Sequence, residues 1–206
     1  MPTPTERFEG ALGDNAGAFD VELRPDQIER LGGYYELLMK WNDRLHLVAP
    51  CSPEEFATRH VLESLLLLPH LTPNARVVDI GSGAGLPILP CLIVRDDLNA
   101  TLFEASPKKA VFLRQALRCA HSREPAQLII ARFEETAVPA AEFFTCRALD
   151  QFSRLLPTLI KWVPAGSTLL LFAGGALVNQ VDALLPAGQV YPIPGSQRRF
   201  LVSIHK

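Results

Sequence analysis

The fold is decided by the stretch Arg76-Val77-Val78-Asp79-Ile80-Gly81-Ser82-Gly83-Ala84-Gly85-Leu86-Pro87, in which an apolar, β-branched run leads into three glycines. The run predicts a short buried strand, and the apolar residues after Pro87 predict a helix. Glycines between a strand and a helix let the backbone come close to a ligand, because no Cβ intervenes, and they leave amide N–H groups free at the helix start. In a doubly wound sheet such a loop lies at the carboxyl edge, where ligands bind.

The spacing of this loop and the acids around it indicate which ligand fits. Gly81, Gly83 and Gly85 form G-x-G-x-G, which differs from the G-x-G-x-x-G of dinucleotide folds. Asp79 ends the strand, and Glu104 ends the next one, 19 residues after Gly85, where a carboxylate can accept hydrogen bonds from a ribose diol. S-adenosylmethionine fits, since it carries a ribose with both hydroxyls and a charged amino-acid tail without a pyrophosphate. A dinucleotide and a tight turn without a ligand are the alternatives.

Strand-like and helix-like segments alternate after residue 76. The expected strands are 76–80, 100–104, 127–130, 143–146 and 167–172, and the expected helices between them are 87–94, 108–120 and 152–162. This alternation predicts an α/β, Rossmann-like fold with a mostly parallel sheet and helices on both faces. Two last apolar runs, 188–193 and 199–204, flank the turn signal Pro194-Gly195-Ser196 and predict an antiparallel pair at one end of the sheet.

The region before the sheet divides into two parts. Residues 1–22 are rich in Gly, Ala, Pro and Thr without a clear period, and we expect a loose N-terminal arm. From Arg24-Pro25-Asp26 onward, apolar residues recur at spacings of three and four, which predicts an amphipathic helix. Ser52-Pro53-Glu54-Glu55 begins a second helical stretch, with a cap, a proline in the first turn and early acids. We therefore expect a helical cap over residues 23–71, in front of a main domain over residues 72–206.

Composition and charge limit the class of protein. The 206 residues are 48% apolar and 20% charged, which is typical of a globular domain and argues against disorder. No apolar run reaches the roughly 18 residues that span a membrane, and residues 1–15 lack a signal-peptide core, so we expect a cytoplasmic protein without a membrane partner. The four cysteines form no C-x-x-C pair, so we expect no metal site. A net charge of −2 still permits a local basic patch that contacts nucleic acid.

Six short segments carry a family resemblance. They are Lys40–Leu47 (KWNDRLHL), Arg59–Leu65 (RHVLESL), Asp79–Pro87 (DIGSGAGLP), Lys108–Leu113 (KKAVFL), Arg132–Glu135 (RFEE) and Cys146–Ala148 (CRA). In this order they are similar to the segments K-W-N-x-x-x-N-L, R-H-x-x-D-S-L, D-V-G-S-G-A-G-L-P, G-K-R-x-x-F-L, R-x-E-E and S-R-A of one family. It comprises the bacterial methyltransferases that make 7-methylguanosine in small-subunit (16S) ribosomal RNA, long called glucose-inhibited division protein B. The ordered set is far more specific than any one motif.

The resemblance implies a class I S-adenosylmethionine-dependent methyltransferase with an N-terminal helical extension. Its acceptor would be N7 of a guanine in small-subunit ribosomal RNA or its ribonucleoprotein. The resemblance implies cofactor contacts at Gly81, Leu86, Phe133, Glu134 and Arg147, with Phe133 and Glu134 beside the adenine. With the residues around the glycine loop, the cofactor-binding candidates are Asp79, Gly81, Gly83, Gly85, Leu86, Glu104, Phe133, Glu134 and Arg147. Because positive charge holds RNA, the main RNA-binding candidates are Arg59, His60, Lys108, Lys109 and Arg147, and further candidates are Arg114, Arg118, Arg123, Arg132 and Arg154.

The sequence also departs from the family pattern at several positions. Ala173 stands where the family motif L-K-G has a lysine, Ile88 replaces a glycine, Glu104 replaces an aspartate and His46 replaces an asparagine. The missing lysine concerns the RNA-facing part more than cofactor binding, because such a charge could contact a substrate phosphate.

The expected chemistry needs little from the side chains. Guanine N7 has a free lone pair and carries no proton, so its attack on an activated methyl group requires positioning rather than a general base. We therefore expect no Ser/His/Asp or paired-carboxylate catalytic set. Two other functions stay open at this point: a methyltransferase of the same fold that acts on a small molecule, and a non-catalytic module that binds RNA or a protein.

Overall fold

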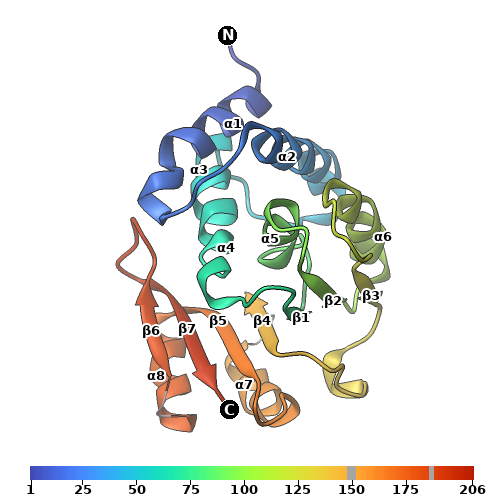
Figure 1. Ribbon diagram of the computed structural model, residues 1–206, viewed down its shortest axis with the longest axis vertical. Helices are drawn as coiled ribbons and strands as arrows, with labels where there is room; N and C mark the ends of the chain where they lie inside the picture. The colour runs from blue at the N-terminus through green and yellow to red at the C-terminus, as the bar shows by residue number, and fades with distance from the viewer. Residues whose placement is uncertain (148–151, 186–187) are drawn as a thin grey trace.

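The molecule is built on one seven-stranded sheet, seen in a computed structural model that describes residues 1–147, 152–185 and 188–206 (Figure 1). The strand order is β3-β2-β1-β4-β5-β7-β6. The strands are β1 (Arg76–Ile80), β2 (Asn99–Phe103), β3 (Gln127–Ile129), β4 (Phe143–Arg147), β5 (Thr168–Gly174), β6 (Gln189–Pro192) and β7 (Arg199–His205). Strands β1 to β5 pair in parallel, whereas β7 pairs antiparallel with β5 and with β6. The predicted α/β class, the mostly parallel sheet and its antiparallel end are confirmed.

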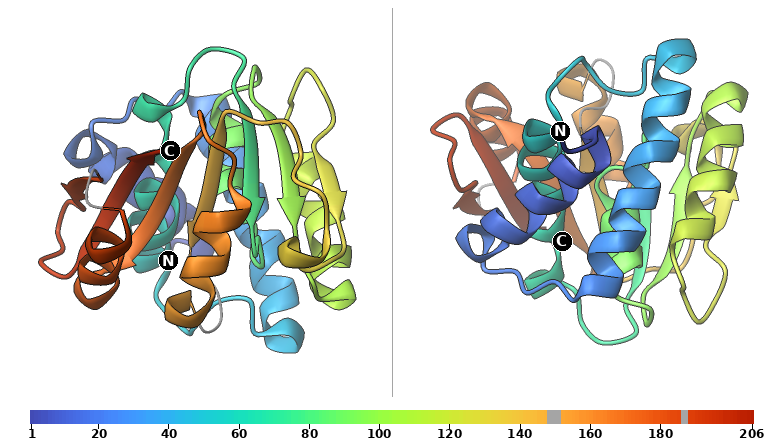
Figure 2. Two further views of the ribbon diagram at one scale, coloured as in Figure 1. Left: turned by 90° about the horizontal axis from the view of Figure 1, so that it is seen from below. Right: turned by 90° about the horizontal axis from the view of Figure 1, so that it is seen from above.

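Helices cover both faces of this sheet (Figure 2). They are α1 (Pro4–Asn15), α2 (Pro25–Leu45), α3 (Pro53–Phe56), α4 (Glu63–Leu65), α5 (Ile88–Val94), α6 (Pro107–Ala116), α7 (Phe152–Trp162) and α8 (Gly175–Leu184). Alternate residues of β1 supply the two cores, because side chains point to opposite faces along a strand. Val77 belongs to the core shared with α2, α5 and α6, whereas Val78 and Ile80 belong to the core under α7 and α8. Helix α8 was not among the helices expected from the sequence.

The N-terminal residues correct one expectation. Residues 1–22 are not a loose arm, since α1 and a 3-10 turn, η1 (Ala16–Phe19), fill most of them. Thr3 caps α1 in a capping box with Glu6, which satisfies backbone N–H groups that would otherwise lack partners. The Gly- and Ala-rich composition hides an apolar face, in which Phe8 is fully buried and stacks on Tyr35 at 4.5 Å between ring centroids. Burial of this face holds α1 on α2 and α3.

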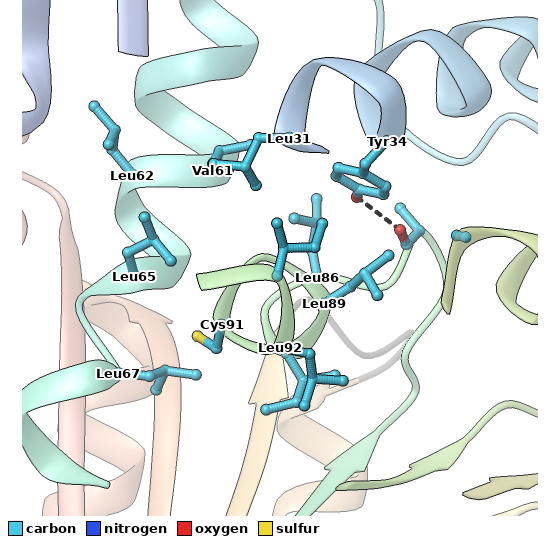
Figure 3. Close-up of a cluster of buried hydrophobic side chains, with 14 of the residues drawn as sticks. Leu31, Tyr34, Val61, Leu62, Leu65, Leu67, Leu86, Leu89, Cys91 and Leu92 are labelled. Atoms are coloured by element: carbon cyan, nitrogen blue, oxygen red, sulfur yellow. Dashed lines mark hydrogen bonds between the residues drawn. The ribbon is translucent and has the colours of Figure 1, made fainter. Parts of the chain in front are cut away.

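The cap helices share one core with the main fold. After α3 the chain continues through a π-helical segment, η2 (Ala57–Leu62), into α4 and a 3-10 turn, η3 (Leu68–His70). Figure 3 shows leucines of η2 and α4 beside α5 and the loop before it, and all of these residues belong to the same buried cluster. The cap is therefore packed against the glycine loop itself. The boundaries at residues 23 and 71 stay predictions.

Among the residues that the structure describes, no helix is both long and apolar enough to cross a membrane. The same residues bring together no group of three His, Cys, Asp or Glu side chains that could hold a metal ion. Ala148, the last residue of one segment in the family resemblance, lies outside the described residues.

Candidate cofactor and acceptor site

The site lies where the carboxyl ends of β1, β2 and β4 meet. Ile80 is in register with Phe103 of β2 and Cys146 of β4, so the loops that follow these strands converge. They border a cavity of about 450 Å³, a size typical of small-molecule sites. The chain reverses strand order here, which is the usual ligand position in an open α/β sheet. Residues of the cap, including His60 and the segment 47–49, close the other side of the cavity.

The three glycines have different tasks in the loop. Gly81, Gly83 and Gly85 all have positive φ, at 72°, 51° and 86°, a region that a side chain disfavours. Gly81 and Gly83 line the cavity, together with Leu86. Gly85 does not line it, and a Cβ there would come within 3.0 Å of Leu89 Cβ. Gly85 therefore allows α5 to pack closely under the loop.

Asp79 supports the loop from beneath. It is fully buried, does not line the cavity, and its Oδ1 accepts a 2.7 Å hydrogen bond from the Thr145 hydroxyl. Its Oδ2 has no hydrogen-bond partner among the described residues. Burial raises the pKa of the Asp79 carboxyl to about 7, because the charged form is poorly solvated there.

Glu104 is the acid that faces both the loop and the cavity. Its Oε2 accepts from the Gly83 amide at 2.8 Å and its Oε1 from the Ser106 amide at 2.7 Å. A carboxylate has about four acceptor positions, so each oxygen can accept one more hydrogen bond. Glu104 lines the cavity and is held rigidly enough to bind a diol. This geometry fits the ribose of S-adenosylmethionine.

Phe133 and Glu134 follow β3 and form the next part of the cavity wall. Phe133 is also a core residue, because its ring packs edge-on against Trp162 at 5.4 Å between centroids. The interaction with Trp162 fixes the phenyl ring at the edge of the cavity. Beside the loop and Glu104, an apolar ring and a carboxylate suit a flat purine with an exocyclic amine. The described residues thus fit S-adenosylmethionine along one edge of the cavity.

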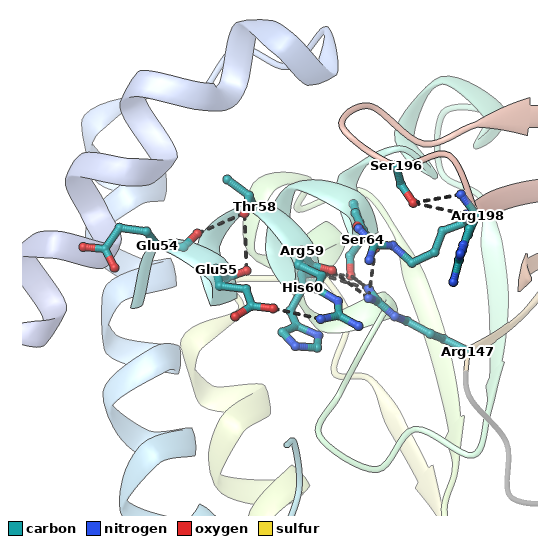
Figure 4. Close-up of polar contacts among 11 residues, drawn as sticks. Glu54, Glu55, Thr58, Arg59, His60, Ser64, Arg147, Ser196 and Arg198 are labelled. Carbon is teal, nitrogen blue, oxygen red and sulfur yellow. Dashed lines mark hydrogen bonds and ion pairs between the residues drawn. The ribbon is translucent and has the colours of Figure 1, made fainter. Parts of the chain in front are cut away.

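Arg147 connects the end of β4 to the cap (Figure 4). Its guanidinium donates to the carbonyls of Arg59 and His60, to the Ser64 hydroxyl and to Glu63 Oε2, at 2.7 to 3.2 Å. Four donated hydrogen bonds leave this side chain little freedom to bind a ligand elsewhere. Arg147 lines the cavity, but in this structure it mainly holds the π-helical segment η2 against the sheet.

Glu63 and Arg199 complete this arrangement and were missed from the sequence. The Glu63 side chain is 2% exposed and also accepts from Arg199 Nη2 at 2.6 Å. Arg199 begins β7, opposite Gly174 of β5. Ala173, at the position of the family's lysine, is buried in the sheet and pairs with Phe200. Arg199 of the neighbouring strand β7 therefore places a cation near the end of β5.

The structure separates the RNA-binding candidates. His60 lines the cavity, and burial with nearby positive charge lowers the pKa of its imidazole to about 3, so it is neutral at pH 7. Lys109 also lines the cavity, whereas Lys108 lies exposed on α6. Arg59 lies outside the lining and pairs with Glu55 at 2.8 Å. Among the main RNA-binding candidates, Lys109 and Arg147 are therefore the charged residues that line the cavity.

A hydrogen bond from the cap to the glycine loop was not visible in the sequence. The Tyr34 hydroxyl of α2 donates to the Ala84 carbonyl at 2.8 Å, fifty residues away in the chain (Figure 3). Tyr34 is fully buried and does not line the cavity, so this contact supports the loop from within the core. The cap thus shapes the cofactor edge as well as the far wall.

Two solved structures that share this architecture carry methyltransferase names. Precorrin-6y C5,15-methyltransferase from Geobacter metallireducens matches with a TM-score of 0.53 at 13% identity, over 70% of this chain and 87% of that one. A dimethyladenosine transferase from Plasmodium falciparum matches with a TM-score of 0.51 at 11% identity, over 69% and 60% of the two chains. The sheet order and the glycine loop at the switch point define the class I methyltransferase fold, whose methyl donor is S-adenosylmethionine.

The family follows from the sequence comparisons. The family model described as rRNA small subunit methyltransferase G (GidB) matches residues 27–186. A Xanthomonas campestris protein called ribosomal RNA small subunit methyltransferase G is 38% identical over 184 residues, covering 84% of each chain. A protein of the same name from Chromobacterium violaceum is 34% identical over 170 residues, covering 82% of this chain and 80% of its own. The chain belongs to the GidB family and is a methyltransferase, as the resemblance implied.

Proposed function

We propose that this methyltransferase transfers a methyl group from S-adenosylmethionine to N7 of a guanine in small-subunit ribosomal RNA. The relatives carry an RNA acceptor in their names, and this chain matches them over most of its length. The observation that carries the proposal is the two-sided cavity. Gly81, Gly83 and Glu104 lie on its cofactor edge, and His60 with segment 47–49 lies on its cap side. An acceptor base that enters on the cap side would face the cofactor edge.

Methyl transfer to N7 requires the protein to position the two reactants and does not require a general base. When bound, S-adenosylmethionine supplies an activated methyl group. Glu104 and the amides of the loop would hold the ribose and the amino-acid tail, and Phe133 would orient the adenine. On the acceptor side, the neutral His60 imidazole can donate or accept a hydrogen bond without adding a positive charge. This matters because methylation at N7 leaves the guanine positively charged.

The acceptor side of the cavity is apolar except at its rim. Leu47 and Val48 on the cap side, together with Leu155 of α7, can cover the faces of a flipped base, while His60 supplies a polar atom. RNA bases that are read singly are usually splayed from a loop and stacked on side chains in this way. We propose that the protein acts in the cytoplasm on the RNA or its ribonucleoprotein.

The test is a methyl-transfer assay with labelled S-adenosylmethionine and three acceptors: small-subunit ribosomal RNA lacking the mark, assembled small subunits lacking it, and a mixture of small metabolites. We expect label in at least one of the two RNA forms. Label only in the metabolite fraction would favour a small-molecule methyltransferase. No binding of S-adenosylmethionine in calorimetry at millimolar concentration would favour a non-catalytic module.

A further inference from the structure

Helix α6 presents a positively charged face to solvent. Lys108, Arg114 and Arg118 are exposed, and Val111 is exposed between them. Residues three or four apart lie on the same side of a helix, so these side chains share one face. Helix α6 ends at Ala116, and a 3-10 turn, η4 (Leu117–Cys119), carries Arg118 onward in the same direction.

No carboxylate compensates this face. The chain has no Asp or Glu from residue 105 to residue 123. Among the described residues, Lys108, Arg114 and Arg118 make no ion pair and no side-chain hydrogen bond. Elsewhere arginines typically face an acid, as do Arg7, Arg24, Arg30, Arg59, Arg76, Arg95, Arg123, Arg132, Arg147 and Arg199. Uncompensated charge in one region of a chain with net charge −2 indicates an anionic partner.

Helix α6 begins at the rim of the cavity. Ala105, just before α6, and Lys109, in its first turn, line the cavity. Arg118 lies ten residues beyond Lys108, which corresponds to about 15 Å along a helix. The same helix therefore connects the acceptor cavity to a row of cations that leads away from it. A chain that enters the cavity with one nucleotide can lie along this row with its neighbours.

We propose that this face of α6, formed by Lys108, Val111, Arg114 and Arg118, binds the phosphate backbone of the RNA next to the target guanine. The proposal rests on the function proposed above and locates the RNA on the surface. Flexible cations without fixed partners suit phosphates, which need charge more than shape. Val111 is the single apolar residue among the four that form this face. One apolar side chain among three cations is a poor match for a membrane or an apolar protein surface.

The experiment measures RNA binding of the full-length protein at several salt concentrations. The probe is small-subunit ribosomal RNA lacking the mark, and the variant combines Lys108→Gln, Arg114→Gln and Arg118→Gln. Lys109 is kept because it lines the cavity. Each lost phosphate contact should reduce the slope of log Kd against log salt by about 0.7, so the three substitutions should reduce it by about 2. We expect Kd at low salt to rise at least about tenfold, with unchanged affinity for S-adenosylmethionine.

A matched control is Lys161→Gln on α7. Lys161 is also exposed and makes no ion pair with the described residues, but α7 lies on the other face of the sheet (Figure 2). This variant should bind RNA with the slope of the wild type. Lys108→Gln alone makes the same chemical change, and it should lower the slope of log Kd against log salt.

The outcomes separate this inference from the proposed function. If the wild type methylates the RNA but the triple variant keeps its slope and its Kd, the inference is wrong and the function stands. If the variant binds free RNA normally and loses activity only on assembled subunits, the face contacts a ribosomal protein, which also overturns the inference. If the wild type methylates neither RNA form, the proposed function itself fails.

Discussion

At the scale of single residues, Glu104 is the side chain that we propose for binding the ribose of the cofactor. Its two oxygens already accept from Gly83 and Ser106, and the same carboxylate faces the cavity. Glu104→Gln keeps the size but removes the charge and part of the acceptor capacity. A hydrogen bond to a charged group contributes about 1.5–3 kcal/mol, so we expect the Kd for S-adenosylmethionine to rise roughly 10- to 100-fold in calorimetry.

The control for this change is Glu29→Gln, which alters an exposed glutamate of α2 in the same chemical way. RNA binding should be unchanged in both variants, because neither residue is part of the cationic face of α6. Equal affinity of the Glu104 variant and the wild type for S-adenosylmethionine would remove Glu104 from the cofactor site.

Asp79 gives a prediction about pH. Burial raises its pKa in the folded protein to about 7, whereas in the unfolded chain the pKa stays near 3.8. Between about pH 4 and pH 7 the folded state therefore binds more protons, and the free energy of unfolding falls as the pH rises through this window. Asp79→Asn does not titrate. Urea unfolding at pH 5 and pH 8 should show that the variant gains stability relative to the wild type at the higher pH. Parallel profiles would show that Asp79 is ionised throughout.

At the scale of elements, helix α1 is the part that the sequence concealed. Its burial depends on Phe8, which packs against Tyr35 and Phe56. Phe8→Ala should lower the free energy of unfolding by about 3–5 kcal/mol, measured by urea denaturation, because it leaves a cavity between α1 and α2. Asp14→Ala on the exposed side of the same helix is the control and should cost far less. Similar stabilities for the two variants would mean that α1 is not docked in solution.

The contact of α4 with β4 and β7 can also be tested. Glu63 is buried between Arg147 at 3.2 Å and Arg199 at 2.6 Å. Glu63→Gln would leave two arginines without their counter-ion, and removing one partner of a buried pair costs on the order of 3 kcal/mol. Glu63→Asp restores the charge and should recover much of the stability. If Gln and Asp at position 63 destabilise equally in urea unfolding, geometry rather than charge holds the cap.

The sequence predicts a feature of the structure when the residues that form it lie close together in the chain. The glycine loop and Glu104 were predictable because each belongs to a strand end with a fixed pattern nearby. The bond from Tyr34 to Ala84 and the pairing of Glu63 with Arg199 were not, since they join segments 50 and 136 residues apart. Helix α1 was missed for a different reason: its capping box was present, but small residues diluted the apolar period.

At the scale of the whole molecule, the cap and the sheet pack together and form the candidate site jointly. The cap supplies a wall of the cavity, a hydrogen bond to the glycine loop and the carbonyls that hold Arg147. In the proposed function, the cofactor, the acceptor base and the RNA backbone would occupy the glycine-loop edge of the cavity, its cap side and the exposed face of α6. This arrangement explains why the resemblance to the family extends into the cap and is not confined to the glycine loop.

The most direct test of the central claim is the identity of the methylated nucleoside. Small-subunit ribosomal RNA lacking the mark is incubated with the protein and labelled S-adenosylmethionine, digested to nucleosides and separated by chromatography with mass detection. We expect the label to elute as 7-methylguanosine and the Glu104→Gln variant to produce less of it at limiting cofactor. Label on another nucleoside, or none in RNA while S-adenosylmethionine binds, would contradict the proposed function.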